Sequence, residues 1–401
     1  MKRILVYSGR LNSSYNQLTL SLMREGRRKG WRFVWLNPSD VQDEHDRVTK
    51  ILEIVKPSGI VSNDISAIAD LLPKGFPVVL VDSRGKSSGV PVIRHDNASF
   101  GVAAADALLG QGTEFAVFGL ADRKCYWSVV RERAFAERIQ AAGFTCHHSH
   151  FDMWLDNPYF ALEDVRKELA ELKRPVSIFA VSDWVADVVL MAAESLGWRC
   201  PQDFRLLGVD DDELICMRSS VALSSIRPDW EQGGRLAFEA LDLQLRGEKP
   251  EREYLYGAVG VVRRASTRTP YRRPKDTRVE KALEFIDTEY ASPISVGDIV
   301  AAMGCSRRLA ELRFRQETGQ TIAEALESAR CDRLFLELKR RGVDFAALPE
   351  LCGFRSAAAL RDCFRRRTGM SMTEWRASQS LRNSCAKYFA HNRRGCLHDA
   401  V

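Results

Sequence analysis

The 401 residues predict two structures in succession: a two-lobed α/β region built on parallel sheets, then an all-α region with two helix-turn-helix motifs. Up to about residue 260, short apolar strand patterns alternate with amphipathic helical patterns. That alternation is typical of parallel sheets covered by helices on both faces. The strands are too numerous for one small sheet, so we expect two lobes that separate near residues 95 to 100. From Val279 onward the pattern is helical.

Each expected element follows from its apolar periodicity. The expected strands are Ile4–Tyr7, Arg32–Leu36, Gly59–Ser62, Val78–Val81, Val92–Ile93, Phe115–Gly119, Ser177–Val181 and Arg205–Val209. The expected helices include Gln17–Lys29, Asp46–Val55, Gly101–Leu109, Arg131–Ala142, Pro158–Leu172 and Asp183–Ser195.

Polar residues follow several of these strands, where ligands of parallel sheets bind. They are Gly9, Arg10, Asn12, Asn63, Asp64, Asp122, Arg123, Arg131, Ser182, Asp183, Trp184, Asp210, Asp211 and Asp212. Carboxylates and arginines form strong hydrogen bonds to hydroxyl groups, and the face of a tryptophan stacks on a sugar ring. The set predicts a site for a polar ligand such as a sugar, although any single aspartate could instead cap a helix.

A short pattern occurs twice between Phe285 and Arg376. Each copy has a short amphipathic helix, a glycine, a serine suited to an N-cap, and a second helix closed by a phenylalanine, as at Gly304, Ser306 and Phe314. A helix that ends at glycine and restarts at serine predicts a helix-turn-helix motif. The repeat therefore predicts a DNA-binding domain with two such motifs.

The second helix of each motif is the expected reading helix in the major groove. The residues expected at DNA are Arg307, Arg308, Glu311, Arg355, Arg361, Asp362, Arg365 and Arg366. Of these, Arg308 and Arg361 are the expected base readers, and Arg365 and Arg366 the expected phosphate contacts. For any single arginine, a plain surface role remains the alternative.

The composition narrows the possible classes of protein, and the sequence shows no catalytic motif. The net charge is only +6, and the ten cysteines are dispersed without a CxxC pair, which favours reduced thiols in the cytoplasm. No apolar run is long enough to span a membrane. His147, His148 and His150 lack a partner spaced to complete a metal shell, so we expect no metal, no cofactor and no catalytic residues.

The α/β region resembles the LacI-type ligand-binding domain, which is similar to periplasmic sugar-binding proteins. The resemblance is carried by Val92–Val102, Val117–Gly119, Arg131–Phe135, Phe179–Asp183, Leu207–Asp211, Val221–Pro228 and Gly233–Phe238. It implies that Asp96, Arg131 and Asp210 contact an effector sugar, and we add Asp183 and Trp184 to that expected site. Ser182 departs from the family, which often has Asn there.

The helical region resembles the AraC/XylS family. The matching words include Pro293–Val296, Gly304–Arg307, Cys352–Ser356, Gly369–Ser371 and Glu374–Arg376. Met372, Leu360 and Ala310 depart from the usual pattern, and Leu309 or Leu312 is expected to fill the core position that Ala310 leaves small. The combination resembles the xylose operon regulators, which implies an activator that recruits RNA polymerase.

The expected layout is a sensor at 1–262, a linker at 263–278, the DNA-binding domain at 279–380 and a tail at 381–401. The expected function is sugar-responsive transcription regulation by a cytoplasmic homodimer, nucleoid-associated when bound to DNA, with operator DNA and a pentose such as D-xylose as partners. The alternative is a cytosolic sugar-binding protein or a sugar-processing enzyme without a DNA-binding role. The sequence leaves open the sugar, the operator and the dimer interface.

Overall fold

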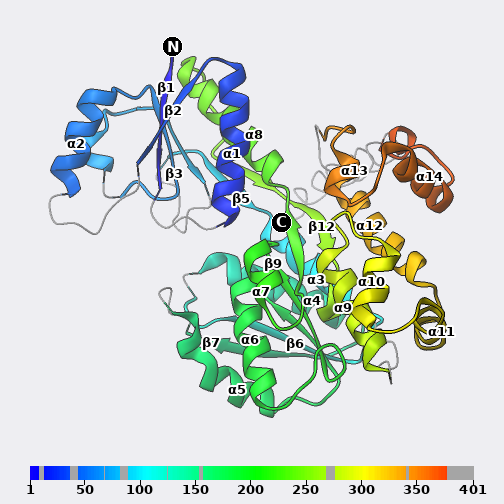
Figure 1. Cartoon of the computed structure of the whole chain (residues 1–401). Helices are drawn as coiled ribbons and strands as arrows, with labels where there is room; N and C mark the ends of the chain where they lie inside the picture. The colour runs from blue at the N-terminus through cyan, green and yellow to red at the C-terminus, as the bar shows by residue number, and fades with distance from the viewer. Residues whose placement is uncertain are drawn as a thin grey trace, which may run out of the picture. The chain divides into compact units, whose positions relative to one another are not determined.

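The computed structural model describes residues 1–8, 13–36, 44–66, 68–81, 89–123, 125–152, 157–267, 276–339 and 343–376. The chain forms two units, Met1–Thr269 and Pro270–Val401, and each is described by itself. Figure 1 shows the α/β unit in blue to green and the helical unit in yellow to red. Among the described residues, no helix is long and apolar enough to cross a membrane.

The first lobe contains a parallel sheet with the strand order β11-β5-β4-β3-β1-β2. Its strands are β1 (Arg3–Tyr7), β2 (Arg32–Leu36), β3 (Gly59–Ser62), β4 (Val78–Val81), β5 (Val92–His95) and β11 (Glu253–Tyr256). Helices α1 (Ser13–Arg28) and α8 (Trp230–Leu245) lie side by side, while α2 (Glu44–Val55) lies across the strands from them (Figure 1). The 3-10 helix η1 (Ala69–Leu71) precedes β4.

The second lobe contains a sheet with the order β12-β10-β9-β8-β6-β7, in which only β12 pairs antiparallel. Its strands are β6 (Glu114–Leu120), β7 (Cys146–Phe151), β8 (Val176–Ala180), β9 (Phe204–Val209), β10 (Ser224–Pro228) and β12 (Ala258–Val262). The eight strands expected from the sequence are confirmed as β1 to β6, β8 and β9.

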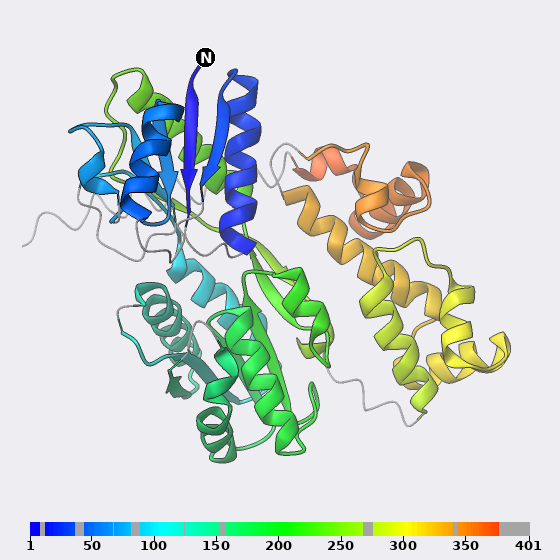
Figure 2. The ribbon, with the colours of Figure 1, turned by 60° about the vertical axis from the view of Figure 1, so that its left-hand side comes forward.

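Helices cover both faces of this second sheet (Figure 2). The chain moves from β6 outward to its neighbour β7, and then back past β6 to β8 on the other side. The two connections are both right-handed but run in opposite directions along the sheet. This reversal puts α4 (Tyr126–Ala141) on one face and α5 (Leu162–Ala170) with α6 (Asp183–Ser195) on the other. Helix α3 (Asn97–Leu108) packs beside α4, and η2 (Pro158–Ala161) and α7 (Glu213–Arg218) complete the lobe.

Three segments connect the lobes, because β5 leads into α3, β10 leads into α8, and β11 leads into β12. The break expected near residues 95 to 100 is therefore confirmed at the end of β5. Hydrogen bonds join the crossing segments: Asp96 N donates to Tyr256 O at 2.8 Å, and Asp229 N donates to Gly257 O at 2.9 Å. Such a narrow, hydrogen-bonded connection is the arrangement used by hinged two-lobed proteins.

The α/β unit extends past the predicted linker boundary at residue 263. Ser266 and Thr267, in the 3-10 helix η3 (Ala265–Thr267), are buried, and their hydroxyls donate to Leu206 O and Ser224 Oγ. Arg264 is also buried and bonded to the sheet. Of the predicted linker, residues 268–275 lie outside the described residues, and Asp276 already caps the next helix.

The helical unit contains α9 (Thr277–Glu289), α10 (Val296–Met303), α11 (Arg307–Thr318), α12 (Ile322–Lys339), α13 (Leu348–Leu351) and α14 (Ala357–Thr368). One apolar cluster packs α9, α10 and α11 against the start of α12, and a second packs α13 and α14 against the end of α12. The unit therefore has two halves, and α12 belongs to both.

The turn between α9 and α10 fastens the two halves together. The buried Arg330 guanidinium on α12 donates to Tyr290 O at 2.9 Å, Ser292 O at 3.1 Å and Ile294 O at 2.8 Å. Gly353 of the second half packs against the same turn, where an added Cβ would lie 2.2 Å from Tyr290 O. Gly353 also has a φ of +72°, so a larger residue would be both strained and obstructed.

Candidate functional site

Arg131 lies where the two lobes of the α/β unit are connected. Its side chain is 2% exposed, and it comes from α4 in the second lobe. Nε donates to Asn97 Oδ1 at 2.8 Å, Nη1 donates to Val181 O at 2.7 Å, and Nη2 lies 3.1 Å from His95 Nδ1. One guanidinium thus contacts the carboxyl ends of β5 and β8 and the start of α3.

Aromatic rings complete the environment of this guanidinium. Its central carbon lies 5.2 Å from the ring centroid of Phe100 and 5.1 Å from that of Trp127. Cation–π contact and three polar contacts compensate for removing the charge from water. Arginine is suited to this position because its planar fork can bond several acceptors at once.

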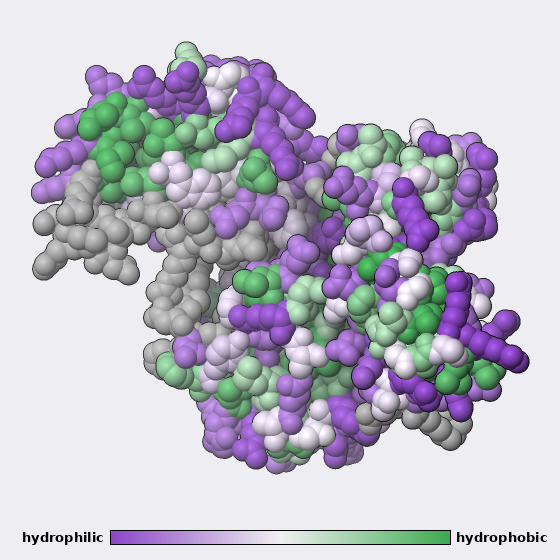
Figure 3. Space-filling view, in the orientation of Figure 1, coloured by the Kyte–Doolittle hydropathy of each residue, from purple (hydrophilic) through white to green (hydrophobic). Residues whose placement is uncertain are grey.

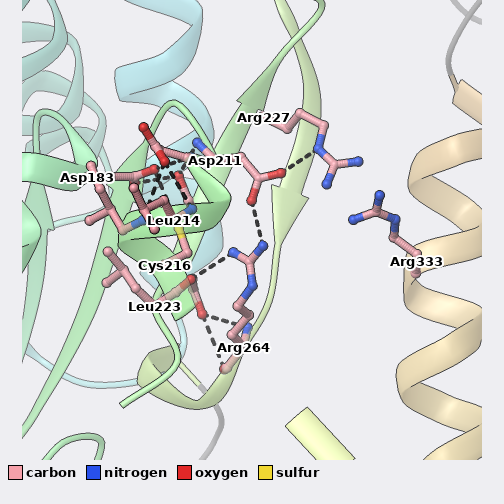
Figure 4. Close-up of polar contacts among 12 residues, drawn as sticks. Asp183, Asp211, Leu214, Cys216, Leu223, Arg227, Arg264 and Arg333 are labelled. Atoms are coloured by element: carbon pink, nitrogen blue, oxygen red, sulfur yellow. Dashed lines mark hydrogen bonds and ion pairs between the residues drawn. The ribbon is translucent and has the colours of Figure 1, made fainter. Parts of the chain in front are cut away.

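Asp183 begins α6 directly after β8 and is 1% exposed. Its Oδ1 accepts from Ser225 Oγ at 2.6 Å, and its Oδ2 accepts from Asp212 N at 2.8 Å and from Cys216 Sγ at 3.5 Å. Burial raises the pKa of Asp183 well above its usual range, and the nearby Asp210 adds to that rise. Figure 4 shows this carboxyl directed at protein groups of β10 and α7.

Asp210 and Asp211 follow β9 with unusual backbone angles. Their φ values are +108° and +46°, conformations that non-glycine residues rarely adopt. Strain of this kind persists only where surrounding contacts hold it, and it is concentrated at functional sites. Asp210 is half-buried and close enough to Asp183 to affect its pKa.

The contacts that hold this strained turn belong to Asp211. Its buried carboxylate accepts from Arg227 Nε at 2.5 Å and from Arg264 Nη2 at 2.8 Å (Figure 4). Burial alone would raise the pKa of Asp211, but the two guanidinium groups outweigh it and hold that pKa below its usual range. Arg264 also donates through Nη1 to Leu223 O at 2.8 Å. Arg264, near the end of the unit, is thereby attached to the strand end that carries Asp210.

Asp96 and Trp184 have clear local partners. The Asp96 side chain caps α3 by accepting from Ser99 N at 3.2 Å, as the capping alternative anticipated. Trp184 is 38% exposed, and the Arg218 guanidinium lies 4.8 Å from its ring centroid. One face of the tryptophan is therefore covered by an arginine of α7.

Arg131 bonds Val181 O, two residues before Asp183 in the chain, and Asp210 lies close enough to Asp183 to raise its pKa. Asp96 adjoins His95 and Asn97, both partners of Arg131. Of the other predicted strand-end residues, Gly9, Arg10 and Asn12 lie outside the described residues. Sequence reasoning missed Arg227 and Arg264 as partners of Asp211, because no local pattern links residues 16 and 53 positions apart.

The helical unit contains both expected helix-turn-helix motifs. In the first, α10 ends at Gly304, which has a φ of +64°, and α11 begins after Ser306, whose Oγ accepts from Leu309 N. In the second, Ser356 Oγ accepts from Ala359 N at the start of α14. These caps satisfy the free N–H groups at the start of each reading helix.

On α11, Arg307 and Arg308 are exposed as expected. Figure 3 shows hydrophilic side chains projecting over the region of α11. Glu311 is half-buried, and its carboxylate lies 3.5 Å from Ile322 N at the start of α12. Of the two leucines expected to fill the core position, Leu312 is 53% exposed and Leu309 is half-buried, while Ala310 is fully buried. The core position on this helix therefore holds the small Ala310, and Leu312 lies on the outer face.

On and before α14, five of the expected contact residues are exposed: Arg355, Arg361, Asp362, Arg365 and Arg366. Arg366 is already paired, because its Nη2 lies 2.8 and 2.9 Å from the two carboxylate oxygens of Glu327 on α12. A phosphate contact by Arg366 would therefore compete with that pair or use the remaining N–H groups of the guanidinium. Leu360 and Phe364 lie in the core of this half.

Two family models match the chain. A periplasmic binding protein-like domain matches residues 105–267, and a helix-turn-helix domain matches residues 299–378. A xylose operon regulatory protein of Haemophilus influenzae is 25% identical over 350 residues, which cover 84% of this chain and 89% of that protein. A xylose operon regulatory protein of Escherichia coli K12 is 27% identical over 265 residues, covering 65% of this chain and 67% of that protein.

Solved structures share the fold. The structure of the xylose-binding transcription activator xylR has a TM-score of 0.56 and 23% identity, and covers 94% of this chain and 98% of that one. A LacI family regulator from Enterococcus faecium with bound ribose has a TM-score of 0.54 and 18% identity, and the match covers 67% of this chain and 100% of that one. The curated relatives are regulators of transcription, not enzymes. The chain is accordingly a transcription regulator in which a periplasmic-binding-protein-like sensor domain precedes an AraC-type helix-turn-helix DNA-binding domain.

Proposed function

We propose that the chain activates transcription of sugar catabolism genes in response to a small neutral sugar, a pentose such as D-xylose. The observation that carries the proposal is the Arg131 network, which joins the strand ends of both lobes at their connection. The names of the relatives, xylose operon regulatory proteins, supply the sugar class.

In this proposal the sugar is held between the carboxyl ends of the two sheets by Asp96, Arg131 and Asp210. Ionised groups suit a neutral polyol because charge-assisted hydrogen bonds to its hydroxyls are about twice as strong as neutral ones. They also reject a wrong sugar, since a missing hydroxyl leaves a charged group unpaired. Asp183 takes a supporting role, because its oxygens already accept from protein groups.

The signal would leave the sensor through Arg264. Asp210 binds the sugar, its neighbour Asp211 holds Arg264, and the chain from Arg264 leads to the DNA-binding domain within a few residues. A sugar can shift the sensor only by its difference in affinity for the two conformations. We propose that the regulator acts as a homodimer in the cytoplasm, binds operator DNA and recruits RNA polymerase.

The test is DNA binding to the upstream promoter, measured by fluorescence anisotropy with and without xylose, arabinose, ribose and glucose. We expect one pentose to change the affinity for DNA and the others to have little effect. DNA binding that responds to no sugar would refute the sensor function, and a folded protein without DNA affinity at low salt would refute the regulator.

The residue assignment is tested by calorimetry with Asp210→Asn. Asparagine tolerates a positive φ, so the variant removes the charge and leaves the strained turn in place. Losing one charge-assisted hydrogen bond should weaken sugar binding by about tenfold to a hundredfold. Asp106→Asn is the matched control, since Asp106 pairs with Arg138 on the surface of the same lobe. Equal affinity in both variants would move the sugar site elsewhere.

A further inference from the structure

A cluster of one carboxylate and two histidines lies in the second lobe, outside the sensor residues described above. His148 and His150 are on the edge strand β7, and their side chains share one face because strand residues alternate. Their rings are stacked at a centroid distance of 6.4 Å. His147 has the opposite orientation, and its Nε2 lies 3.4 Å from Glu168 of α5.

Glu132 of α4 supplies the carboxylate that the sequence pattern lacked. Its side chain is 3% exposed and packs over Gly119 of β6, where an added Cβ would lie 2.0 Å from Oε1. Oε1 accepts from Ser128 Oγ at 2.5 Å, whereas Oε2 lies 2.8 Å from His150 Nε2. The glycine and the serine thus orient the carboxylate so that one oxygen is directed at the histidines.

The three donor groups already converge. One ligand atom from each of Glu132, His148 and His150 lies within 4.8 Å of the others. Ligand bonds to Zn²⁺ are about 2.0–2.2 Å for nitrogen and carboxylate donors, so small side-chain rotations would bring all three onto one ion.

A positive charge already lies at this cluster. The Arg123 guanidinium is 3.2 Å from both Glu132 Oε2 and His150 Nε2. Its side chain is 55% exposed, so it can turn into solvent at little cost. The cluster therefore favours a cation, and in the absence of a metal ion the arginine supplies it.

We propose that Glu132, His148 and His150 form a binding site for a divalent transition metal ion, with Zn²⁺ as the best match to two imidazoles and one carboxylate. Three protein ligands leave a fourth position for water. The ion would attach the edge strand β7 to α4 and displace Arg123 from Glu132. The site uses none of the residues assigned to sugar or DNA.

The experiment measures Zn²⁺ binding to the full chain by competition with a chromogenic chelator, and Co²⁺ binding by visible absorption. We expect saturable binding of one ion that His148→Ala and His150→Ala each weaken at least about tenfold. Both histidines are exposed, so their variants should fold, which the unfolding midpoint without metal checks. Arg123→Gln should bind the ion more tightly, since it removes the competing charge.

His147→Ala is the matched control, because it removes a histidine from the same strand but from the opposite face. It should bind Zn²⁺ like the unchanged protein, and this comparison also separates the site from any binding by the ten cysteines. The proposal is overturned if no saturable binding occurs, or if the His148 and His150 variants bind as tightly as the His147 variant.

Discussion

Replacing Arg264 by methionine should destabilise the sensor strongly, although this residue lies in a segment whose sequence predicts a linker. The side chain is 5% exposed and bonds Asp211 Oδ1 and Leu223 O. Removing one partner of a buried ion pair costs about 3–5 kcal/mol when the other charge is left uncompensated. Since Arg227 remains paired with Asp211, we expect the lower end of that range, about 3 kcal/mol.

This loss can be measured as a shift in thermal unfolding. For a unit of this size, 1 kcal/mol corresponds to about 2–4 °C, so the midpoint of the sensor transition should fall by about 6–12 °C. Arg263→Met is the control, because Arg263 is the exposed neighbouring arginine and donates through Nη2 to Ala107 O at 3.2 Å. Its midpoint should move by no more than about 2 °C.

The effect of Arg264→Met should also depend on pH in a defined direction. The pKa of Asp211 is lowered in the folded protein, so its contribution to stability is complete above the ordinary aspartate range. That contribution is lost as pH falls through the lowered pKa. The difference in unfolding midpoint between wild type and variant should then become smaller. Equal midpoints for Arg263→Met and Arg264→Met at neutral pH would refute the assignment of Arg264 to the sensor.

Two further predictions concern the sensor core and the reading helices. Because the pKa of Asp183 is raised, its neutral carboxyl stabilises the fold at low pH and this contribution is lost as pH rises through that pKa. Asp183→Asn should remove this fall in the free energy of unfolding, as measured by urea unfolding from about pH 4 to 9. The same pH dependence of the unfolding free energy in variant and wild type would contradict this. On DNA, Arg308→Ala should cost about 1–3 kcal/mol and relax preference at one base pair, whereas Arg365→Ala should weaken all sequences and reduce the salt slope by about 1. The same uniform loss for both variants in salt-titrated binding would show that the roles are misassigned.

The local patterns in the sequence predicted most of the architecture. Apolar runs placed eight strands, and the Gly304–Ser306 pattern with its second copy placed both reading helices. The polar edge strand Cys146–Phe151 and the three strands near residues 224–262 have weak or unusual patterns, and none of these four was among the eight strands expected from the sequence. Periodicity identifies an element only when one face is apolar along its length.

Pairings between distant residues were not predictable in this way. The sequence around Asp211 does not predict its ion pair with Arg264, and the sequence around His150 does not predict its contact with Glu132. The linker error has the same origin, because Arg263 and Arg264 look equivalent until the fold buries only one of them. A single charged residue in a polar segment carries no signal of burial, since its partner is set by tertiary structure.

The fastening of both helix-turn-helix halves to the turn at residues 290–294 has a consequence for the operator. Arg330 and Gly353 hold the two reading helices at a fixed separation and rotation within the domain. One base pair inserted between the two half-sites would displace them by about 3.4 Å and rotate them by roughly 35° around the duplex. The domain cannot follow that rotation without breaking buried bonds, so we expect a change in operator spacing to weaken binding as strongly as a change in the bases.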